Sequence, residues 1–406
     1  MSRIFFYSAQ VLYIRSASDN RVMYRYNWEY KEWPNFKYST KGLEKTLLQI
    51  SRNEGKYDGI VNMLSENVKA DAIIDLMVIE AIKSSEIEGE FYSRKDVLSS
   101  IKKNLGLHQK SLTIINKNAE GISKVMVDIR TSFAKPLTKA KLFEWHKMLF
   151  STYTNIEVGK WRTHLEPMQI VSGAYGKQKV HFEAPPSHSL EKEMKGFIQW
   201  FNDTAPNGNQ AIENSAVRAA LVHLYFESIH PFEDGNGRIG RVLAEKALSQ
   251  SMQKPALLSL SATIEKNKKE YYAQLQVGQK NLNATQWVHY FVNTILKSQE
   301  YAEKQIEFTI NKASFFDRYK AKLNARQLKA IKKIMEEGSG GFKGGLNATK
   351  YKSINKTSKA TATRDLQELV ELGIIIQTGG GRSTSYSLKL DFKSEPNRKN
   401  SRLKIS

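Results

Sequence analysis

The stretch HPFEDGNGRIGR at residues 230–241 constrains the fold of this chain most, because it places reactive side chains between two helical patterns. Apolar residues recur at helical spacing in residues 211–229, before the stretch, and in residues 242–252, after it. We therefore predict that residues 230–241 form a loop between two helices. No other dozen residues of the chain bring so many reactive groups together, so this loop is the candidate active centre.

The middle of the loop is suited to binding phosphate. Gly235, Asn236 and Gly237 permit backbone angles that turn successive N–H groups toward one point, which makes an anion-binding nest at the positive start of the second helix. Arg238 and Arg241 lie three residues apart, so they share one helical face, and their guanidinium groups match phosphate oxygens. Together these residues predict a polyphosphate ligand.

The loop also supplies a base and a metal ligand. His230 follows the first helix, and an imidazole can take a proton from a hydroxyl near neutral pH. Asp234 offers carboxylate oxygens to the Mg²⁺ that accompanies a nucleoside triphosphate, whereas we expect Glu233 to be solvated. A histidine beside proline, or a Gly-Asn-Gly turn, is alone usually structural. In this combination and order they predict attack of a hydroxyl on a bound phosphate.

The stretch resembles the signature of the Fic family, His-x-Phe-x-Asp/Glu-Gly-Asn-Gly-Arg-x-x-Arg, at every fixed position. Members of that family transfer AMP from ATP to a Ser, Thr or Tyr hydroxyl of a protein. The resemblance implies His230 as the base and Asp234 as the Mg²⁺ ligand. It also implies an α-phosphate site at Gly235, Asn236 and Gly237, and sites for the β- and γ-phosphates at Arg238 and Arg241. The kinases of the Doc-like branch depart from the signature at the second glycine and the next arginine, which this chain keeps, so AMP transfer is favoured.

Residues 65–85 are typical of a long helix without Gly or Pro, and the motif SSEIEG follows at residues 84–89. A glutamate near a helix end is by itself usually solvated. However, Ser84, Glu88 and Gly89 resemble the inhibitory motif of Fic proteins, Ser/Thr-x-x-x-Glu-Gly/Asn, which implies that the chain carries its own inhibitory helix. A Glu88 carboxylate paired with Arg241 would occupy the guanidinium that the γ-phosphate needs and would repel that phosphate.

Residues 158–163 and 173–183 place glycine-containing turns between short β-prone runs, which predicts a β-hairpin. Fic proteins have such a flap over the loop, and its edge can pair with the backbone of a target protein by strand addition. We predict this target-docking edge at Lys179, Val180, His181 and Phe182. His181 and His188 have no further ligand at close spacing, so we do not expect a metal site there.

Residues 264–275 open a further helix that contains two adjacent tyrosines. Adjacent residues point to different faces of a helix, so at most one of the rings would face the core. A matching Tyr-Tyr pair lines the adenosine pocket of the Fic family. The resemblance therefore implies Tyr271 and Tyr272 as nucleotide-binding residues, with Gln279 as a further candidate. The alternative is that these are buried residues of the core.

Composition bounds the class of protein. The chain has 406 residues, 40% of them hydrophobic, enough for two or three domains with their own cores. It has no cysteine, which excludes disulfides, cysteine zinc sites and thiol nucleophiles and fits an intracellular protein. No apolar run approaches the roughly 20 residues of a membrane helix, and no signal peptide is evident, so we expect a cytoplasmic protein without membrane contact.

The formal net charge is +21, and residues 312–406 alone carry 21 basic and 8 acidic residues. A polyanionic partner is therefore expected in this last quarter, unless the charge only aids solubility. Residues 324–390 predict three helices followed by a hairpin, which resembles a winged helix. Its recognition helix would begin with Lys359, Thr361, Thr363 and Arg364 and would bind DNA or protein. Residues 391–406 are typical of a disordered basic tail.

Residues 22–40 are rich in aromatic side chains and resemble the short domain with a Trp-Pro-x-Phe element that precedes many bacterial Fic domains. We expect a small core there, with base stacking or peptide binding as alternatives. Residues 1–21 do not resemble that domain and would be an extension.

We therefore expect a mainly α protein. Its parts would be an N-terminal extension and small aromatic-rich domain (1–60), a helical Fic domain with a β-hairpin flap and an inhibitory helix at about 65–89 (61–300), a connector (301–320), a winged helix-turn-helix domain (321–390) and the tail. The expected function is autoinhibited AMP transfer from ATP to other proteins and to itself. Family members often form homodimers.

Two further classes of function stay open. One is a DNA-binding regulator that uses the Fic part as a nucleotide sensor, and the other is removal of AMP or transfer of a different nucleotide. The intact His230, Asp234 and Arg238 argue against a purely regulatory role, because a sensor needs no base.

Overall fold

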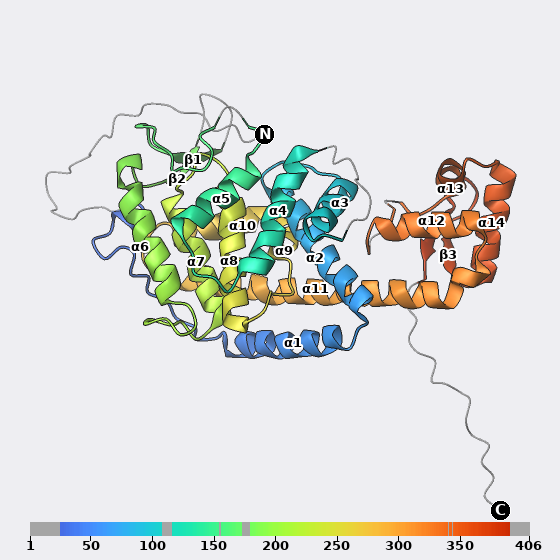
Figure 1. Cartoon of the computed structure of the whole chain (residues 1–406), viewed down its shortest axis with the longest axis horizontal. Helices are drawn as coiled ribbons and strands as arrows, with labels where there is room; N and C mark the ends of the chain where they lie inside the picture. The colour runs from blue at the N-terminus through green and yellow to red at the C-terminus, as the bar shows by residue number, and fades with distance from the viewer. Residues whose placement is uncertain are drawn as a thin grey trace, which may run out of the picture. The chain divides into compact units, whose positions relative to one another are not determined.

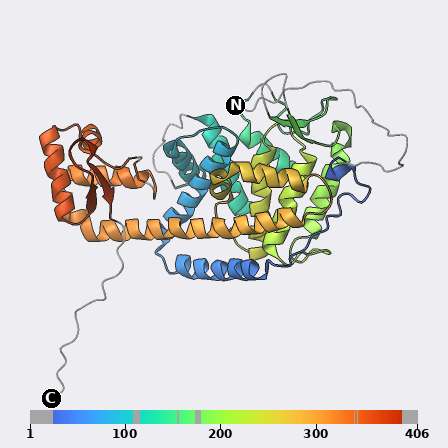
Figure 2. The same cartoon turned by 180° about the vertical axis from the view of Figure 1, so that it is seen from behind.

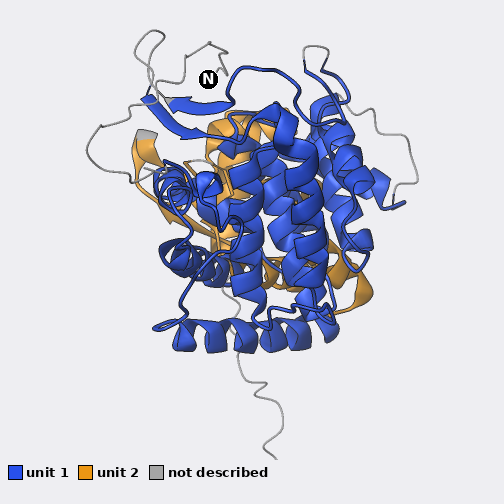
Figure 3. Ribbon diagram, turned by 90° about the vertical axis from the view of Figure 1, so that its left-hand side faces the viewer, with its two compact units in different colours: residues 1–63, 73–302 blue, residues 64–72, 303–406 orange. Residues whose placement is uncertain are grey.

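The computed structural model describes residues 25–107, 116–153, 156–172, 179–339, 341–342 and 344–389. The chain divides into two compact units, drawn in different colours in Figure 3. Unit 1 consists of Met1–Met63 and Ile73–Ala302, and unit 2 of Leu64–Ala72 and Glu303–Ser406. The expected extension at residues 1–21, the turn of the predicted hairpin at 173–178 and the expected tail at 391–406 lie outside the described residues.

Helices make up most of the described part of unit 1 (Figure 1). In chain order they are the 3-10 helix η1 (Asn27–Glu29), α1 (Glu44–Asn62), α2 (Glu66–Ile87), α3 (Arg94–Asn104), α4 (Lys117–Ser132), α5 (Lys139–Leu149), the 3-10 helix η2 (Ser187–Ser189), α6 (Leu190–Asp203), α7 (Ser215–Ile229), α8 (Asn236–Met252), α9 (Leu260–Lys266), α10 (Lys268–Gly278) and α11 (Thr285–Tyr319). The first residues of α2 and the last part of α11 belong to unit 2.

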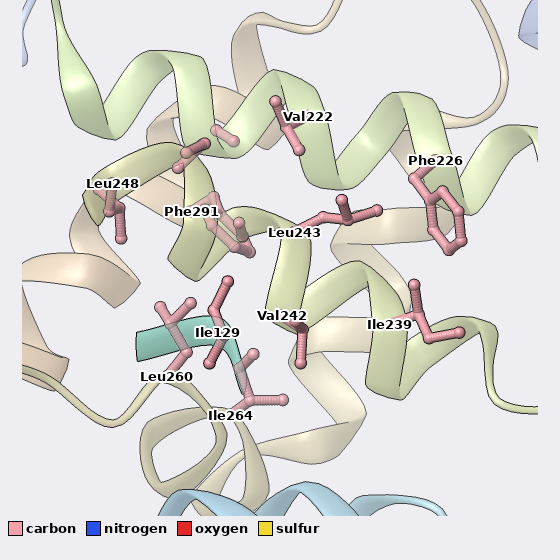
Figure 4. Packing of buried hydrophobic residues seen from close by; sticks show 14 of the residues in the cluster. Ile129, Val222, Phe226, Ile239, Val242, Leu243, Leu248, Leu260, Ile264 and Phe291 are labelled. Atoms are coloured by element: carbon pink, nitrogen blue, oxygen red, sulfur yellow. The ribbon is translucent and has the colours of Figure 1, made fainter. Parts of the chain in front are cut away.

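Helix α7 lies at the centre of unit 1, and every residue from Ala216 to Ile229 is buried. A helix that is apolar on all sides can be stable only when other elements surround it. Asn214 caps its start, because the side-chain oxygen accepts hydrogen bonds from the N–H groups of Ala216 and Val217. Figure 4 shows Val222 and Phe226 of α7 in one buried cluster with residues of α8, α9 and α11. The predicted pair of helices around residues 230–241 is therefore the core of the unit.

Strands β1 (Gln169–Ser172) and β2 (Lys179–Glu183) form an antiparallel pair in the region of the predicted flap. The predicted stretch 158–163 forms a turn and no strand, so the hairpin begins later than expected. Gln169 pairs with Glu183 and Ser172 with Lys179, and the register shifts between Ile170 and Val171. The shift leaves one extra residue in β2, which is the pattern of a β-bulge.

The aromatic segment that opens the described chain packs into unit 1, as expected of a small core. The Tyr26 ring meets the Phe182 ring edge-on at 5.1 Å, and the Trp28 indole Nε1 donates a 2.7 Å hydrogen bond to the Glu183 carbonyl. Further along, the Trp33 ring lies edge-on to Tyr225 of α7 at 5.1 Å. The segment thus joins the flap strand β2 to the central helix.

Helix α1 continues this segment and lies beside the first part of α11 (Figure 2). The Asn53 side chain donates to the Gln299 side-chain oxygen at 3.4 Å, and Gln299 in turn donates to the Ile50 carbonyl at 3.3 Å. Segments about 250 residues apart in sequence are therefore joined within unit 1.

Unit 2 contains the elements predicted for the C-terminal part in the predicted order. They are the 3-10 helix η3 (Lys320–Lys322), α12 (Ala325–Glu336), α13 (Ala348–Asn355), α14 (Lys359–Glu371), β3 (Ile375–Thr378), the 3-10 helix η4 (Gly381–Ser383) and β4 (Ser385–Leu388). Strands β3 and β4 pair antiparallel, and Leu346 bridges to Tyr386. Assignment as a winged helix, like the predicted domain boundaries, stays a prediction.

A buried carboxylate joins the three helices of unit 2. Asp365 of α14 is 1% exposed and accepts hydrogen bonds from Arg326 Nε (2.7 Å), from Arg326 Nη2 (2.9 Å) and from the Tyr351 hydroxyl (2.9 Å).

None of the helices in the described parts of the chain combines the length and apolar character that a membrane crossing needs.

Replacing Asp365 with Ala should lower the free energy of unfolding of unit 2 by about 2 kcal/mol, because the buried Tyr351 hydroxyl loses its acceptor. The Arg326 guanidinium holds the pKa of Asp365 below its ordinary value. Stability of the parent should therefore fall as the pH drops below about 4, and the variant should lack this component. Hydrogen exchange of residues 303–389 measures both effects. The control is Glu371→Gln, exposed on the same helix, and equal exchange in all three proteins would contradict the prediction.

Candidate active site

His230 follows the last residue of α7 in a left-handed backbone conformation, with φ 49° and ψ 60°. Its N–H donates to the Phe226 carbonyl at 3.0 Å and so ends the helix. The buried Arg162 fixes the turn from the other side, because its Nε donates to the His230 carbonyl at 2.9 Å and its backbone N–H to the Pro231 carbonyl at 3.0 Å. The candidate base therefore sits on a backbone held at both ends.

Glu227, one helical turn before His230, is a site residue that the sequence reading missed. Its Oε2 lies 3.6 Å from His230 Nδ1, longer than a hydrogen bond, and neither Glu227 Oε1 nor His230 Nδ1 has a hydrogen-bond partner. Burial alone would raise the pKa of Glu227, but the His230 and His223 imidazoles and the Arg241 guanidinium hold it below its ordinary value. A carboxylate facing Nδ1 leaves Nε2 as the nitrogen that can accept a proton. The sequence offered one signal for Glu227, which is its position three residues before His230.

The side chain of Asn236 shapes the loop. Its Oδ1 accepts from the Phe232 N–H at 2.9 Å and its Nδ2 donates to the Phe232 carbonyl at 2.8 Å, so both ends of the amide are used inside the loop. Gly235 precedes it with φ 83°, a left-handed angle that favours glycine, and α8 begins at Asn236. The backbone N–H of Asn236, and not its side chain, is thus the group left to meet a phosphate.

The buried His146 of α5 holds the loop in place, and the sequence analysis did not predict it as a site residue. The His146 ring stacks on Phe232 at 4.2 Å, its Nε2 lies 3.2 Å from the Asp234 carbonyl, and its Nδ1 accepts from the Gly159 N–H at 2.9 Å. Burial lowers the pKa of His146 to about 4, so the ring is neutral near pH 7 and Nε2 carries the proton that it donates. No motif marks this residue, which lies in an ordinary amphipathic helix, α5.

Asp234 presents its carboxylate toward solvent, with 44% of the side chain exposed. Its Oδ1 accepts from the Gly235 N–H at 2.5 Å and lies 3.6 Å from Arg238 Nη2. Partial desolvation by the surrounding loop raises the pKa of Asp234, and the carboxylates of Glu88 and Glu90 add to this shift, whereas Arg238 opposes it. The described residues contain no group of three or more metal-ligating side chains. One accessible carboxylate beside a phosphate nest nevertheless fits Mg²⁺, which takes most of its ligands from water and phosphate.

Arg241 of α8 is enclosed by the end of α2. Its Nη2 donates to Glu88 Oε1 at 2.9 Å and to the Ser84 carbonyl at 2.9 Å, and its Nε donates to the Ser84 hydroxyl at 3.1 Å. Burial alone would lower the pKa of Arg241, but the Glu88 carboxylate raises it above its ordinary value. A Cβ built on Gly237 would lie 2.4 Å from Glu88 Oε1, so this carboxylate lies directly over the nest.

Arg238, the other arginine, meets a carboxylate that the sequence reading did not single out. Its Nη1 donates to Glu90 Oε2 at 2.9 Å, and its guanidinium lies 4.7 Å from the centre of the Phe150 ring. The side chain of Arg238 is only 3% exposed. The structure therefore brings together His230, Asp234, the nest, both arginines, Ser84 and Glu88, as the sequence predicts, and adds Glu90, Glu227 and His146.

Comparison with known proteins assigns this region. Residues 136–248 match the model of the Fic/DOC family, and residues 26–107 match a domain of unknown function, DUF4172. The chain contains a Fic/DOC domain. The second match includes α1, α3 and the predicted inhibitory motif at the end of α2, and most of it lies within unit 1.

Several relatives are similar over short stretches. The protein adenylyltransferase fic-1 of Caenorhabditis briggsae is 29% identical over 136 residues, which are 34% of this chain and 23% of that protein. A Fido domain-containing protein of Dictyostelium discoideum is 48% identical over 59 residues, 14% of this chain and 39% of that protein. A crystal structure of a Fic domain containing signaling protein from Bacteroides thetaiotaomicron covers 64% of this chain and 97% of its own, with 20% identity and a TM-score of 0.49.

Helix α2, which ends in the predicted inhibitory motif, is anchored to residues that follow the Fic/DOC match of 136–248. The buried Glu80 accepts from the Ser259 hydroxyl at 2.7 Å and from the Ser261 N–H at 3.0 Å. At the end of the helix, the Lys268 ammonium donates to the Ile87 carbonyl. Its positive charge is also attracted by the partial negative charge of the helix C-terminus. These contacts fix α2 in the position that brings Glu88 to Arg241.

The three residues predicted for the adenosine pocket separate in the structure. Tyr271 is 1% exposed and its hydroxyl lies 3.2 Å from His223 Nε2, so it belongs to the core. Gln279 is 2% exposed and donates to the Glu227 carbonyl at 3.1 Å. Tyr272 is 40% exposed and its ring lies 5.0 Å from that of Tyr271. Only Tyr272 has a face that a nucleotide could contact in this conformation.

Of the four residues predicted for the target-docking edge, some are exposed and others are covered. Lys179 and Val180 are exposed, whereas Phe182 is 1% exposed and packs inward against Tyr26. The His181 carbonyl accepts from Gln276 Nε2 at 3.4 Å, and the next carbonyl on that side, Glu183, accepts from Trp28. The free part of the edge is therefore shorter than the sequence predicts.

Glu233 also differs from its expected state. The sequence predicts a solvated side chain, but Glu233 Oε2 accepts a hydrogen bond from the Glu157 N–H at 3.1 Å. This contact helps to hold the segment before β1 against the loop.

Replacing His146 with Gln should remove a pH-dependent loss of stability. A histidine that is neutral when folded and protonated below about pH 6.5 when unfolded destabilises the fold as the pH falls from about 6.5 toward 4. Between pH 7 and pH 5 the parent should lose about 2 kcal/mol more than the variant, because an amide cannot titrate there. Urea unfolding at both pH values measures this. His188→Gln, exposed in η2, should behave like the parent, and an equal loss in His146→Gln would refute the prediction.

Proposed function

We propose that this protein is a protein adenylyltransferase held inactive by its own Glu88. The observation that supports the proposal best is the position of the Glu88 carboxylate, 2.9 Å from Arg241 Nη2 and directly over the Gly237 end of the nest. A carboxylate there occupies the place of a phosphate and uses the guanidinium that would bind it. The relatives named protein adenylyltransferase support the activity at the level of the family.

The reaction follows from the chemistry of the site. The oxygen of a Ser, Thr or Tyr hydroxyl on the target forms a bond with the α-phosphorus of ATP, and its proton passes to His230 Nε2. The bond between the α-phosphorus and the oxygen that bridges to the β-phosphate breaks, and pyrophosphate leaves. Glu227 faces His230 Nδ1 and stabilises the imidazolium that forms.

The phosphates of ATP would meet the positive end of the site. The backbone N–H groups of Gly235–Gly237 lie at the start of α8, and Arg238 and Arg241 follow on one face of that helix. Asp234, with water and phosphate oxygens, would hold Mg²⁺, which neutralises charge on the phosphates. Tyr272 would contact the adenosine, and the exposed edge at Lys179 and Val180 would bind the target backbone.

Replacing Glu88 with Gly should raise AMP transfer at least about tenfold, because Arg241 loses its carboxylate partner and the nest becomes free for the γ-phosphate. His230→Ala in the same background should return transfer to the level of the parent, because the base is lost. Intact mass of the protein, and of a cell lysate incubated with it, measures AMP gain in the presence of ATP and Mg²⁺.

The matched control is Glu86→Gln, which changes a glutamate in the same helical turn that pairs with Lys83 at 2.5 Å and does not touch the arginines. It should leave AMP transfer at the level of the parent. If Glu88→Gly binds ATP but adds AMP to nothing, the adenylyltransferase proposal fails.

A DNA-binding regulator is the second candidate function, and the surface of α14 favours it. Its first turns expose Lys359, Thr363 and Arg364, and Gln367 extends this face, whereas Glu368 and Glu371 follow only near the end of the helix. Basic and polar groups at the start of the second helix of a helix-turn-helix are where contacts to bases and phosphates are made. In this proposal the Fic/DOC domain would act as a nucleotide sensor.

Replacing Lys359 and Arg364 together with Ala should then weaken binding to a labelled mixed-sequence DNA duplex roughly tenfold and make it less dependent on salt. Fluorescence anisotropy at low and at physiological salt measures this. Lys333→Ala, on the exposed face of α12, is the control for a mere loss of positive charge. If the parent does not bind the duplex at low salt, the regulator function is excluded.

Other features are proposed from the resemblance and the composition. They are homodimer formation, removal of AMP as the reverse activity and a cytoplasmic location. The absence of cysteine from the sequence is consistent with a cytoplasmic location.

A further inference from the structure

Glu90 has the surroundings of a residue that is held in place. Its Oε2 accepts the 2.9 Å hydrogen bond from Arg238 Nη1 and a hydrogen bond from the Tyr92 hydroxyl, and its Oε1 accepts from the Tyr153 hydroxyl at 2.8 Å. Its side chain is 22% exposed. Burial and Glu90 raise the pKa of Tyr153 to about 12, so this hydroxyl stays protonated and donates. Three donors from three parts of the unit thus converge on one carboxylate.

Glu90 belongs to the same segment as the inhibitory glutamate. Helix α2 ends at Ile87, Gly89 follows with φ 83°, and the Glu90 N–H donates back to the Ser85 carbonyl at 3.0 Å. Glu88 therefore lies before the reversal of the chain and Glu90 after it. One segment places a carboxylate on each of the two arginines of the loop, Glu88 on Arg241 and Glu90 on Arg238.

Charge explains what this second pair does. Besides Glu227, which faces His230, three carboxylates lie beside the two guanidinium groups, namely Glu88, Glu90 and Asp234. A triphosphate carries about four negative charges and is repelled by such a site. When both glutamates leave, the negative charge beside the two arginines falls by two, and the repulsion of the triphosphate falls with it. Removal of Glu88 alone leaves Arg238 still neutralised.

Arg238 does not need Glu90 to hold its position. Its guanidinium packs over the Phe150 ring at 4.7 Å, and its Nη2 lies 3.6 Å from Asp234 Oδ1. Its Nε is buried without a hydrogen-bond partner. The side chain is thus oriented by groups of α8 and α5 and their flanks, and an unused donor is already present for a phosphate oxygen.

We propose that Glu90 is a second inhibitory carboxylate, which blocks Arg238 while Glu88 blocks Arg241. This inference rests on the proposed adenylyltransferase function for its effect on AMP transfer, but its effect on nucleotide binding does not depend on that function. Full activation then requires release of both glutamates from the arginines.

The experiment compares the parent, Glu90→Gln, Glu88→Gly and the double variant in the full chain. Titration calorimetry with ATP, without added Mg²⁺, gives affinity, and intact mass with ATP and Mg²⁺ gives AMP transfer. Glu90→Gln should tighten ATP binding about three- to tenfold, because Gln carries no charge. The double variant should transfer AMP faster than Glu88→Gly by a similar factor. Tyr153→Phe, which removes one donor from Glu90, should shift affinity in the same direction by less.

Glu86→Gln, a glutamate two residues before Glu88, controls for loss of charge on the segment, and thermal unfolding of each variant controls for folding. If Glu90→Gln binds ATP more weakly, or slows the Glu88→Gly variant, then Glu90 orients Arg238 and the proposal is overturned. An affinity equal to that of Glu86→Gln also overturns it. Tighter ATP binding without AMP transfer in any variant supports the second inhibitory carboxylate and rejects the adenylyltransferase function.

Discussion

The buried guanidinium of Arg241 determines how the rest of the site is arranged. A charge removed from water must be paired, and here the end of α2 supplies the carbonyl and hydroxyl of Ser84 and the carboxylate of Glu88. These contacts require α2 to lie along the start of α8. The anchors at Glu80 and Lys268 keep it there, so the Ser84–Glu88 motif is part of the fold of unit 1.

The match to a domain of unknown function acquires a physical meaning from this arrangement. It begins at Tyr26, which packs on the flap strand, and extends past Glu90, which binds Arg238. The region therefore contacts the Fic/DOC domain at two places that matter for the proposed reaction, the flap and the phosphate site. Tyr26, Trp28 and Trp33 of this region pack against the flap strand and α7, as expected of a small core.

Much of the site could be predicted from the sequence because local spacing determines it. The loop residues, the two arginines and the Ser84–Glu88 pair lie within short motifs whose geometry follows from a helix end or a helix start. The position of Glu227 three residues before His230 was a further local signal. Glu90 and His146 could not be found in this way. Their roles depend on which distant element packs beside them, as when His146 of α5 meets the Asp234 carbonyl, 88 residues away. The same reason separates Tyr272 from Tyr271 and Gln279, since only tertiary packing decides which of them is exposed.

The fold was predictable to a similar extent. The central pair α7 and α8, the flap and the order of elements in unit 2 follow from apolar periodicity and turn residues. The covering of the β2 edge by Trp28 and Gln276 does not, because it depends on contacts across about 100 residues or more.

The two glutamates proposed as inhibitory lie at a helix end that is itself buried, and this bears on how they would leave the arginines. Ser84, Ser85 and Ile87 are at most 1% exposed, and the carbonyls of Ser84 and Ile87 accept hydrogen bonds from Arg241 and Lys268. Fraying of an exposed helix end therefore does not describe this segment. In the proposed mechanism the buried contacts would have to break together, so release of the arginines would be a rare cooperative opening of the segment.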